Sequence, residues 1–141
     1  SEHFFALFLD NLRKDPAKHT SQHVVQALEE TISQTKSLLR EHEVSKPILL
    51  NVAVTNGDFV IATRYVSDAG MQPHTLYHSE GSRYVCRDGV CRMVEGGKKD
   101  TAVLIVSEKL TDVQEDWHEV PRNHFVVVRE DLTVALRPIE A

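Results

Sequence analysis

Several features are scarce in this chain of 141 residues, and each scarcity excludes a class of protein. There are two cysteines, too few for the disulfide framework of a small secreted domain. The longest apolar run, Phe4 to Leu9, is far shorter than the roughly 20 residues of a membrane-spanning helix. No basic segment followed by an apolar one marks a secretory signal, so we expect a cytoplasmic protein.

Basic residues are outnumbered, with 16 Lys and Arg against 21 Asp and Glu and a formal net charge of −5. Nucleic-acid binders normally present a basic face, so we expect no nucleic-acid partner. The 41% hydrophobic and 26% charged residues are typical of a globular domain, and the chain is long enough to bury a core. No repeat or linker divides it, which predicts one domain over residues 1–141. Ser1 in place of an initiator Met is compatible with a fragment or a processed piece.

Two amphipathic helices are expected at the start of the chain. The first carries Phe4, Leu7, Phe8 and Leu12 at helical spacing, with Ser1 as its N-cap, and ends near Lys14 before Asp15-Pro16. The second begins near Thr20 or Ser21, is capped by that hydroxyl, and ends near His42. Its apolar stripe consists of Val24, Val25, Leu28, Ile32, Thr35 and Leu39.

After Pro47 the pattern changes to alternation rich in β-branched residues, which predicts strands. Asn56-Gly57 is typical of a type I′ hairpin turn, in which both central residues have positive φ. The continuous apolar run 101–107 indicates a central strand covered on both faces. The expected strands are 48–55, 58–66, 76–79, 83–87, 90–94, 101–107, 123–129 and 132–137, with a turn or 3₁₀ segment at 110–116 and a mobile loop at 95–100.

The order of these elements predicts an α+β fold: two helices followed by about eight mostly antiparallel strands, with the helices packed on one face of the sheet or sheets.

The cysteines and histidines leave alternatives open. Cys86 and Cys91 flank the predicted Asp88-Gly89 turn, where they could form a disulfide or a weak thiolate site. We favour two small, buried or half-buried hydrophobic residues in a reducing cell. His19 and His23 are four residues apart, but a cap at Thr20 or Ser21 places His19 outside the helix, so a solvated pair is favoured over a metal site. His74 and His78 are too far apart on a strand to share one ion.

Other catalytic patterns are missing. No serine lies in a G-x-S-x-G elbow, and Gly96-Gly97-Lys98-Lys99 lacks the remaining positions of a phosphate-binding loop. Ser1 could act as an N-terminal nucleophile only if it began a strand, and it begins a predicted helix. The residues alone therefore indicate a soluble α+β domain without a complete active site.

Four blocks nevertheless resemble one family. They are residues 1–9, residues 56–65 (Asn-Gly-Asp-Phe-Val-Ile-Ala-Thr-Arg-Tyr), residues 76–79 (Leu-Tyr-His-Ser), and residues 106–110 (Val-Ser-Glu-Lys-Leu) with 117–121 (Trp-His-Glu-Val-Pro). In kind and order they are similar to the C-terminal half of class II glutamine amidotransferases. The resemblance is strongest to a small stand-alone branch that includes the amidotransferase subunit of a glutathione-degrading complex.

This resemblance implies part of an αββα sandwich of the N-terminal-nucleophile-hydrolase type. Family members attack the amide of glutamine, or a γ-glutamyl amide, with an N-terminal cysteine whose α-amine is the base. That cysteine and the oxyanion and carboxylate-binding groups would lie upstream of Ser1, so the chain holds no catalytic residue, cofactor or metal. The implied partners are the missing N-terminal half, a glutamine-like small molecule, and another subunit or a second copy.

The resemblance leaves four residues as a possible substrate-pocket wall: Arg64, Tyr65, Ser107 and Glu108. The alternative for each is structural: a surface ion pair for Arg64, a sheet aromatic for Tyr65, and a strand-to-turn transition at Ser107-Glu108. Two other functions compete with the amidotransferase: an interaction module that associates through an uncovered sheet surface, and a metal-binding domain that uses His19, His23 and the cysteines.

Overall fold

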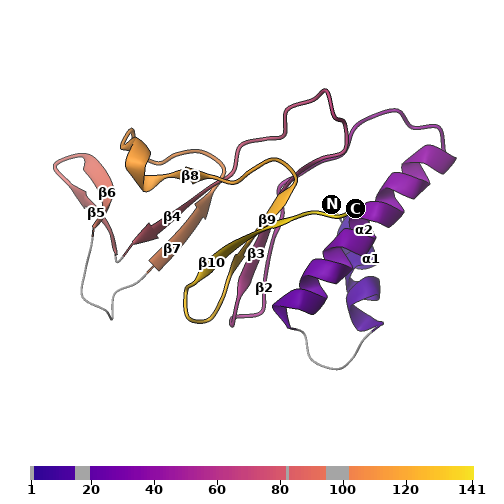
Figure 1. Cartoon of the computed structure of the whole chain (residues 1–141), viewed down its shortest axis with the longest axis horizontal. Coiled ribbons are helices and arrows are strands. Elements are labelled where there is room, and N and C mark those ends of the chain that lie inside the picture. The colour runs from indigo at the N-terminus through magenta and orange to yellow at the C-terminus, as the bar shows by residue number, and fades with distance from the viewer. Residues whose placement is uncertain (1, 15–19, 82, 95–101) are drawn as a thin grey trace.

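A computed structural model describes residues 2–14, 20–81, 83–94 and 102–141, and for 83, 84, 92 and 93 the backbone alone. Three layers are stacked along its longest axis (Figure 1). Two helices form one outer layer, a five-stranded sheet forms the middle, and a smaller sheet with a two-stranded ribbon forms the other side. The α+β prediction of two helices followed by antiparallel strands is therefore confirmed.

Both helices begin and end close to the predicted positions. Helix α1 spans Glu2–Arg13 and α2 spans Ser21–Glu41. The hydroxyl oxygen of Thr20 accepts a hydrogen bond from the backbone N–H of His23 at 3.4 Å, and this satisfies one of the free donors in the first turn of α2. Ser1, the predicted N-cap of the first helix, and His19, which was predicted to precede the second helix, lie outside the described residues.

A buried polar contact joins the two helices. The Asn11 side-chain amide donates to the Thr31 hydroxyl at 3.0 Å and to Gln34 at 3.1 Å, and the Thr31 hydroxyl donates to the backbone carbonyl of Ala27. Asn11 and Thr31 are both buried. Because a buried amide requires partners, this network fixes how α1 lies against α2.

The Thr20 cap provides a simple stability test. Thr20→Ala is expected to lower the free energy of unfolding by about 1 kcal/mol because a backbone donor loses its acceptor. Thr20→Ser keeps the hydroxyl and is expected to stay within about 0.5 kcal/mol of the parent. Urea unfolding followed by circular dichroism measures both. Equal stability of Thr20→Ala and the parent would show that the cap contributes nothing.

The five-stranded sheet has the order β1-β3-β9-β10, and β2 also pairs with β3. All its pairs are antiparallel, with Ala62 opposite Val126 and Val126 opposite Leu136. The strands are β1 Leu49–Leu50, β2 Ala53–Thr55, β3 Val60–Val66, β9 His124–Val128 and β10 Val134–Pro138. The predicted strand 48–55 is thus divided in two, which is one reason why the described residues form ten strands instead of about eight.

The β2–β3 turn is not the expected type I′ turn. Thr55 pairs with Val60, so the loop has four residues, and Gly57 has a positive φ of 99° whereas Asn56 has none. The Asn56 side chain instead accepts the backbone N–H of Asp58 at 3.0 Å. This side-chain turn competes with the tight hairpin turn. At the second hairpin both Asp88 (φ 52°) and Gly89 (φ 80°) adopt the type I′ signs.

The smaller sheet has the order β7-β4-β8. Its strands are β4 Tyr77–Gly81, β7 Ala102–Val106 and β8 His118–Glu119; the ribbon consists of β5 Arg83–Arg87 and β6 Val90–Val94, and η1 Gln114–Asp116 is the expected 3₁₀ turn. The prediction that 101–107 is a central strand is wrong for the described part: β7 pairs with β4 alone and is half-buried. The predicted mobile loop 95–100 lies outside the described residues.

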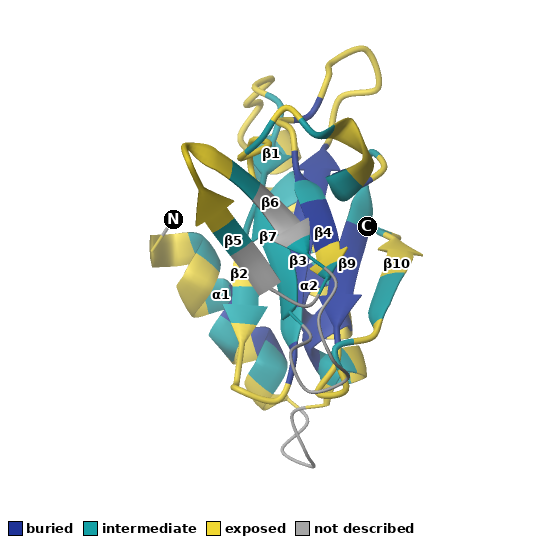
Figure 2. Cartoon of the chain, turned by 90° about the vertical axis from the view of Figure 1, so that its left-hand side faces the viewer, coloured by how far each residue is buried: buried dark blue, intermediate teal, exposed yellow. Residues whose placement is uncertain are grey.

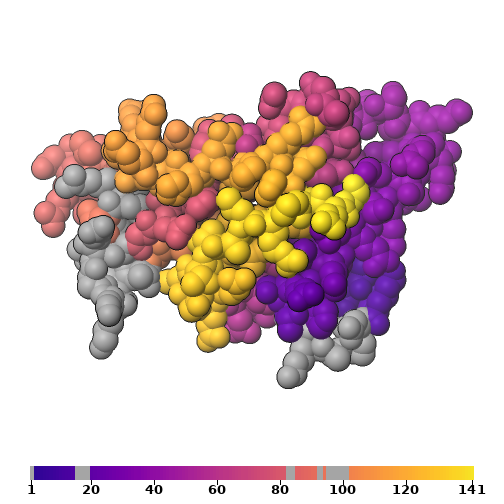
Figure 3. Space-filling view, viewed as in Figure 1, coloured from indigo at the N-terminus to yellow at the C-terminus, as the bar shows by residue number. Residues whose placement is uncertain are grey.

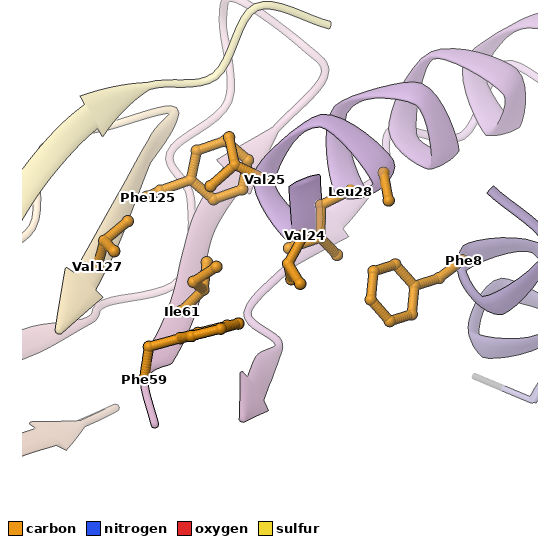
Figure 4. Close-up of a cluster of buried hydrophobic side chains, with 9 residues drawn as sticks. Phe8, Val24, Val25, Leu28, Phe59, Ile61, Phe125 and Val127 are labelled. Carbon is orange, nitrogen blue, oxygen red and sulfur yellow. The ribbon is translucent and has the colours of Figure 1, made fainter. Parts of the chain in front are cut away.

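Two apolar cores hold the layers together. The first lies between the helices and the five-stranded sheet, where Ile61, Phe125 and Val127 point toward Val25 and Leu28 of α2 (Figure 4). The second lies between the two sheets; its buried members are Ala62, Leu76, Val120, Val126 and Val128. Strands β3 and β9 supply side chains to both cores, and this explains their burial in Figure 2.

The C-terminal residues pack beside the helices. In the space-filling view the end of the chain lies against α2 (Figure 3). The Lys36 ammonium group donates to the carbonyl oxygen of Ala141 at 2.7 Å, and the backbone N–H of Glu140 donates to the Glu29 carboxylate at 3.0 Å. These contacts hold the segment that follows β10 on the helical layer.

Candidate functional site

Arg64 occupies a junction between the two sheets. It shares the face of β3 that carries Ala62, which belongs to the core between the sheets. Its Nε donates to the carbonyl of His74 at 2.9 Å, its Nη1 donates to the carbonyl of Val120 at 2.5 Å, and its Nη2 lies 2.8 Å from a carboxylate oxygen of Glu119. The Arg64 side chain is only 9% exposed, so the expected surface ion pair is instead a buried clamp.

Tyr65 does not face the same space as Arg64. Successive residues of a strand point to opposite faces, which places Tyr65 on the face of Ile61, toward the helices. Tyr65 is buried, and this burial raises the pKa of its hydroxyl. These two neighbours therefore cannot form one continuous wall, and for Tyr65 the geometry fits a sheet aromatic.

Ser107 and Glu108 are exposed and directly follow β7. The register places both Val106 of β7 and Glu119 of β8 opposite Tyr77 of β4. Ser107 and the ion-pair partner of Arg64 thus lie at the same end of the smaller sheet, roughly 10 Å apart across β4. The structure brings three of the four predicted residues to one end of this sheet, although it does not place them in contact.

A pair of histidines was missed by the sequence analysis. His78 of β4 pairs with His118 of β8, and their ring centroids lie 5.2 Å apart. The Nδ1 atom of His78 is buried without a hydrogen-bond partner and lies 3.5 Å from a carboxylate oxygen of Glu80. Local spacing could not reveal this pair, because 40 residues separate the two histidines and only strand pairing joins them.

Burial lowers the pKa of His78 below its ordinary value; Glu80 raises it in part and His118 lowers it further. A proton then binds more readily to the unfolded chain than to the folded one. We therefore expect stability to fall as the pH drops below about 6.5 and approaches the lowered pKa. Urea unfolding at pH 7.5 and pH 5 tests this: His78→Gln should reduce the loss of stability, whereas exposed His3→Gln should leave it unchanged. Equal losses in all three proteins would contradict the prediction.

Cys86 and Cys91 form a disulfide, so the favoured reading of two unbonded small residues is wrong. Their register explains the pairing: Arg87 and Val90 close the two-residue turn, and Cys86 and Cys91 are the next opposed pair. No cysteine in the described residues is free, and these residues contain no group of three His, Cys, Asp or Glu side chains able to hold a metal. His19, part of the metal-binding alternative, lies outside them.

An apolar groove of about 690 Å³ opens between α1 and the β1–β2 edge of the sheet. We call it the edge groove. Except for Thr55 its lining residues are apolar: Phe4, Phe5 and Phe8 of α1, Leu28 of α2, and residues 49, 50 and 52–54. Phe5 is 57% exposed. Neither helix of the described residues is long and apolar enough to cross a membrane.

Two known proteins are similar to this chain along nearly its whole length, one in sequence and one in fold. The chain is 33% identical to the probable glutamine amidotransferase DUG3 of Saccharomyces cerevisiae over 99% of this chain and 42% of that protein. The fold matches a glutamine aminotransferase class-II domain protein from Silicibacter pomeroyi with a TM-score of 0.67 and 25% identity, over 99% of this chain and 51% of that one. No family model matches. Both similar proteins are described as glutamine amidotransferases or aminotransferases, and this chain spans about half the length of each.

Proposed function

We propose that this chain is the C-terminal portion of a class II glutamine amidotransferase. The supporting observation is the similarity to the yeast amidotransferase along 99% of the chain, over less than half of that protein. The complete protein would hydrolyse the amide of glutamine, or another γ-glutamyl amide, with an N-terminal cysteine upstream of this chain. Both cysteines of the described residues are held in a disulfide, so they supply no nucleophile.

The proposed reaction has two steps. The upstream thiolate attacks the γ-carbonyl carbon, and the C–N bond breaks with protonation of the leaving ammonia, which leaves a thioester. Water then attacks the thioester and releases glutamate and the thiol. The upstream α-amine would accept and return the proton. This chain would supply the scaffold of the sandwich and, through the exposed end of β7, a part of the pocket wall.

Within that wall, Ser107 and Glu108 are the substrate-facing residues we propose. Both are exposed at the end of β7, where a polar side chain can reach a ligand. We assign Arg64 a positioning role, because its guanidinium group already binds two carbonyls and Glu119, and it holds the end of β8 in place. Tyr65 faces the helices, so we assign it no part in this wall.

The central experiment measures glutamate and ammonia release from glutamine by this chain expressed together with its upstream coding sequence. We expect release that iodoacetamide abolishes. The Cys86→Ser/Cys91→Ser double variant is the matched control: it should stay active and remain sensitive to iodoacetamide, because the reactive thiol lies elsewhere. Absence of thiol-dependent release from the complete protein would defeat the assignment.

Glu108 allows a test of the pocket wall in the same protein. A carboxylate there could accept a charge-assisted hydrogen bond from the α-ammonium group of glutamine, so Glu108→Gln should raise KM for glutamine about tenfold or more. Glu130→Gln, on the exposed turn before β10, is the control and should leave KM unchanged. An unchanged KM in Glu108→Gln would remove Glu108 from the wall.

A further inference from the structure

We propose that the edge groove accepts an extended β-strand supplied by the part of the longer protein that this chain does not include. The first observation is that the helical layer reaches beyond the sheet. In Figure 2 the N-terminal half of α1 extends past β2, with no strand in front of it in that view. Phe4 and Phe5, in the first turns of α1, line the groove there, and Phe5 is 57% exposed. The helical layer thus extends beyond the β2 edge of the sheet.

The backbone of β2 is arranged to receive such a strand. The N–H of Thr63 donates to the carbonyl of Val52 at 2.9 Å, which makes Val52 a hydrogen-bonded position with β3. In an antiparallel pair these positions alternate, so Val54 also bonds toward β3. The backbone groups of Ala53 and Thr55 point away from β3, and among the described residues β2 pairs with β3 alone. An added strand could hydrogen-bond to Ala53 and Thr55.

The apolar lining of the edge groove and the length of the two similar proteins favour the same occupant, a strand from the other half of a longer protein. A strand added at this edge would direct every second side chain toward Phe4, Phe5 and Phe8, so these side chains should be apolar. The two similar proteins are about twice as long as this chain, which matches 42% and 51% of them. We expect the rest of a protein of that length to pack against the matched half at the edge groove, because the groove offers both apolar surface and strand backbone. The choice of this occupant rests on the proposed function, because it requires that the chain belong to a longer protein.

The test uses the complete protein, this chain with its upstream coding sequence. Backbone hydrogen exchange at Thr55, resolved by NMR, should be at least 100-fold slower than the unprotected rate, because a partner strand accepts its N–H. Two variants should speed it at least tenfold. Phe5→Asp places a charge in the groove, and Ala53→Pro removes an outward N–H without losing a bond to β3. Leu38→Asp, which changes an apolar residue of α2 that is 49% exposed, should leave the rate within twofold.

Three outcomes would overturn the proposal. Exchange at Thr55 near the unprotected rate in the complete parent protein shows that no strand occupies the edge. Protection that disappears on a 100-fold dilution, together with a fall in sedimentation coefficient, identifies a second copy as the occupant. Protection unchanged by both Phe5→Asp and Ala53→Pro places its origin elsewhere.

This result is independent of catalysis. Glutamine hydrolysis with a rapidly exchanging Thr55 would reject the strand and keep the proposed function. Protection of Thr55 in a complete protein that releases no glutamate would reject the function and keep the strand.

Discussion

Replacing Arg64 with alanine is expected to lower the free energy of unfolding by about 3 kcal/mol. The guanidinium group donates to the buried carbonyl of Val120 and to the partly buried carbonyl of His74. The buried acceptor left without a donor costs about 1–3 kcal/mol, and the loss of a side chain that is only 9% exposed adds to this. Glu119 adds little to this sum, because its side chain is 52% exposed and water can solvate it. Urea unfolding of the parent and the variant measures the difference.

Two further variants separate the contributions of charge and geometry at this position. Arg64→Lys keeps the charge but not the planar fork that reaches three acceptors, so its stability should lie between those of the parent and Arg64→Ala. Glu119→Gln should cost less than about 1 kcal/mol. If Glu119→Gln proved as damaging as Arg64→Ala, the ion pair and not the carbonyl clamp would be the stabilising contact.

Phe125→Ala is expected to cost about 3–5 kcal/mol, the range for removal of a large aromatic side chain from a core. Phe125 is fully buried, and its ring lies between the five-stranded sheet and α2 (Figure 4). The cavity would lie inside the first core, where helix and sheet both border it and cannot easily close it. Thermal or urea unfolding of the variant gives the magnitude.

Leu136→Ala is the matched control, since Leu136 lies on the neighbouring strand β10, opposite Val126, and is 41% exposed. Its change should stay within about 0.5 kcal/mol. Comparable losses at Leu136 and Phe125 would show that the two cores do not dominate stability.

The local features of the fold could be predicted from the sequence because their causes are local. Thr20 caps α2 as expected, since an acceptor side chain and the first helical donor are only three residues apart. The Asp88-Gly89 turn joins β5 and β6 as predicted. Asn56-Gly57 shows the limit of this reasoning, because the Asn56 side chain bonds to Asp58 and favours a different turn.

The pairing of distant segments could not be predicted in the same way. The apolar run of β7 predicted a central strand covered on both faces, whereas the described part is half-buried and pairs with β4 alone, because an apolar run carries no information about how many strands flank it. Likewise, the role of Arg64 depends on Val120, and that of His78 depends on His118. For the candidate site, the predicted strand 58–66 already implied opposite orientations for Arg64 and Tyr65. Which of the two faces the helices and which faces the smaller sheet followed only once β3 was placed.

The position of β3 in its sheet constrains the order of events during synthesis on the ribosome. One neighbour, β2, is joined to it by a four-residue loop, so that hairpin can close soon after residue 66 has emerged. The other neighbour, β9, is translated some sixty residues later, and the Arg64 contact to Val120 spans 56 residues. In a nascent chain one backbone edge of β3 would therefore stay unpaired until β9 leaves the exit tunnel, an interval of several seconds at about 5–20 residues per second.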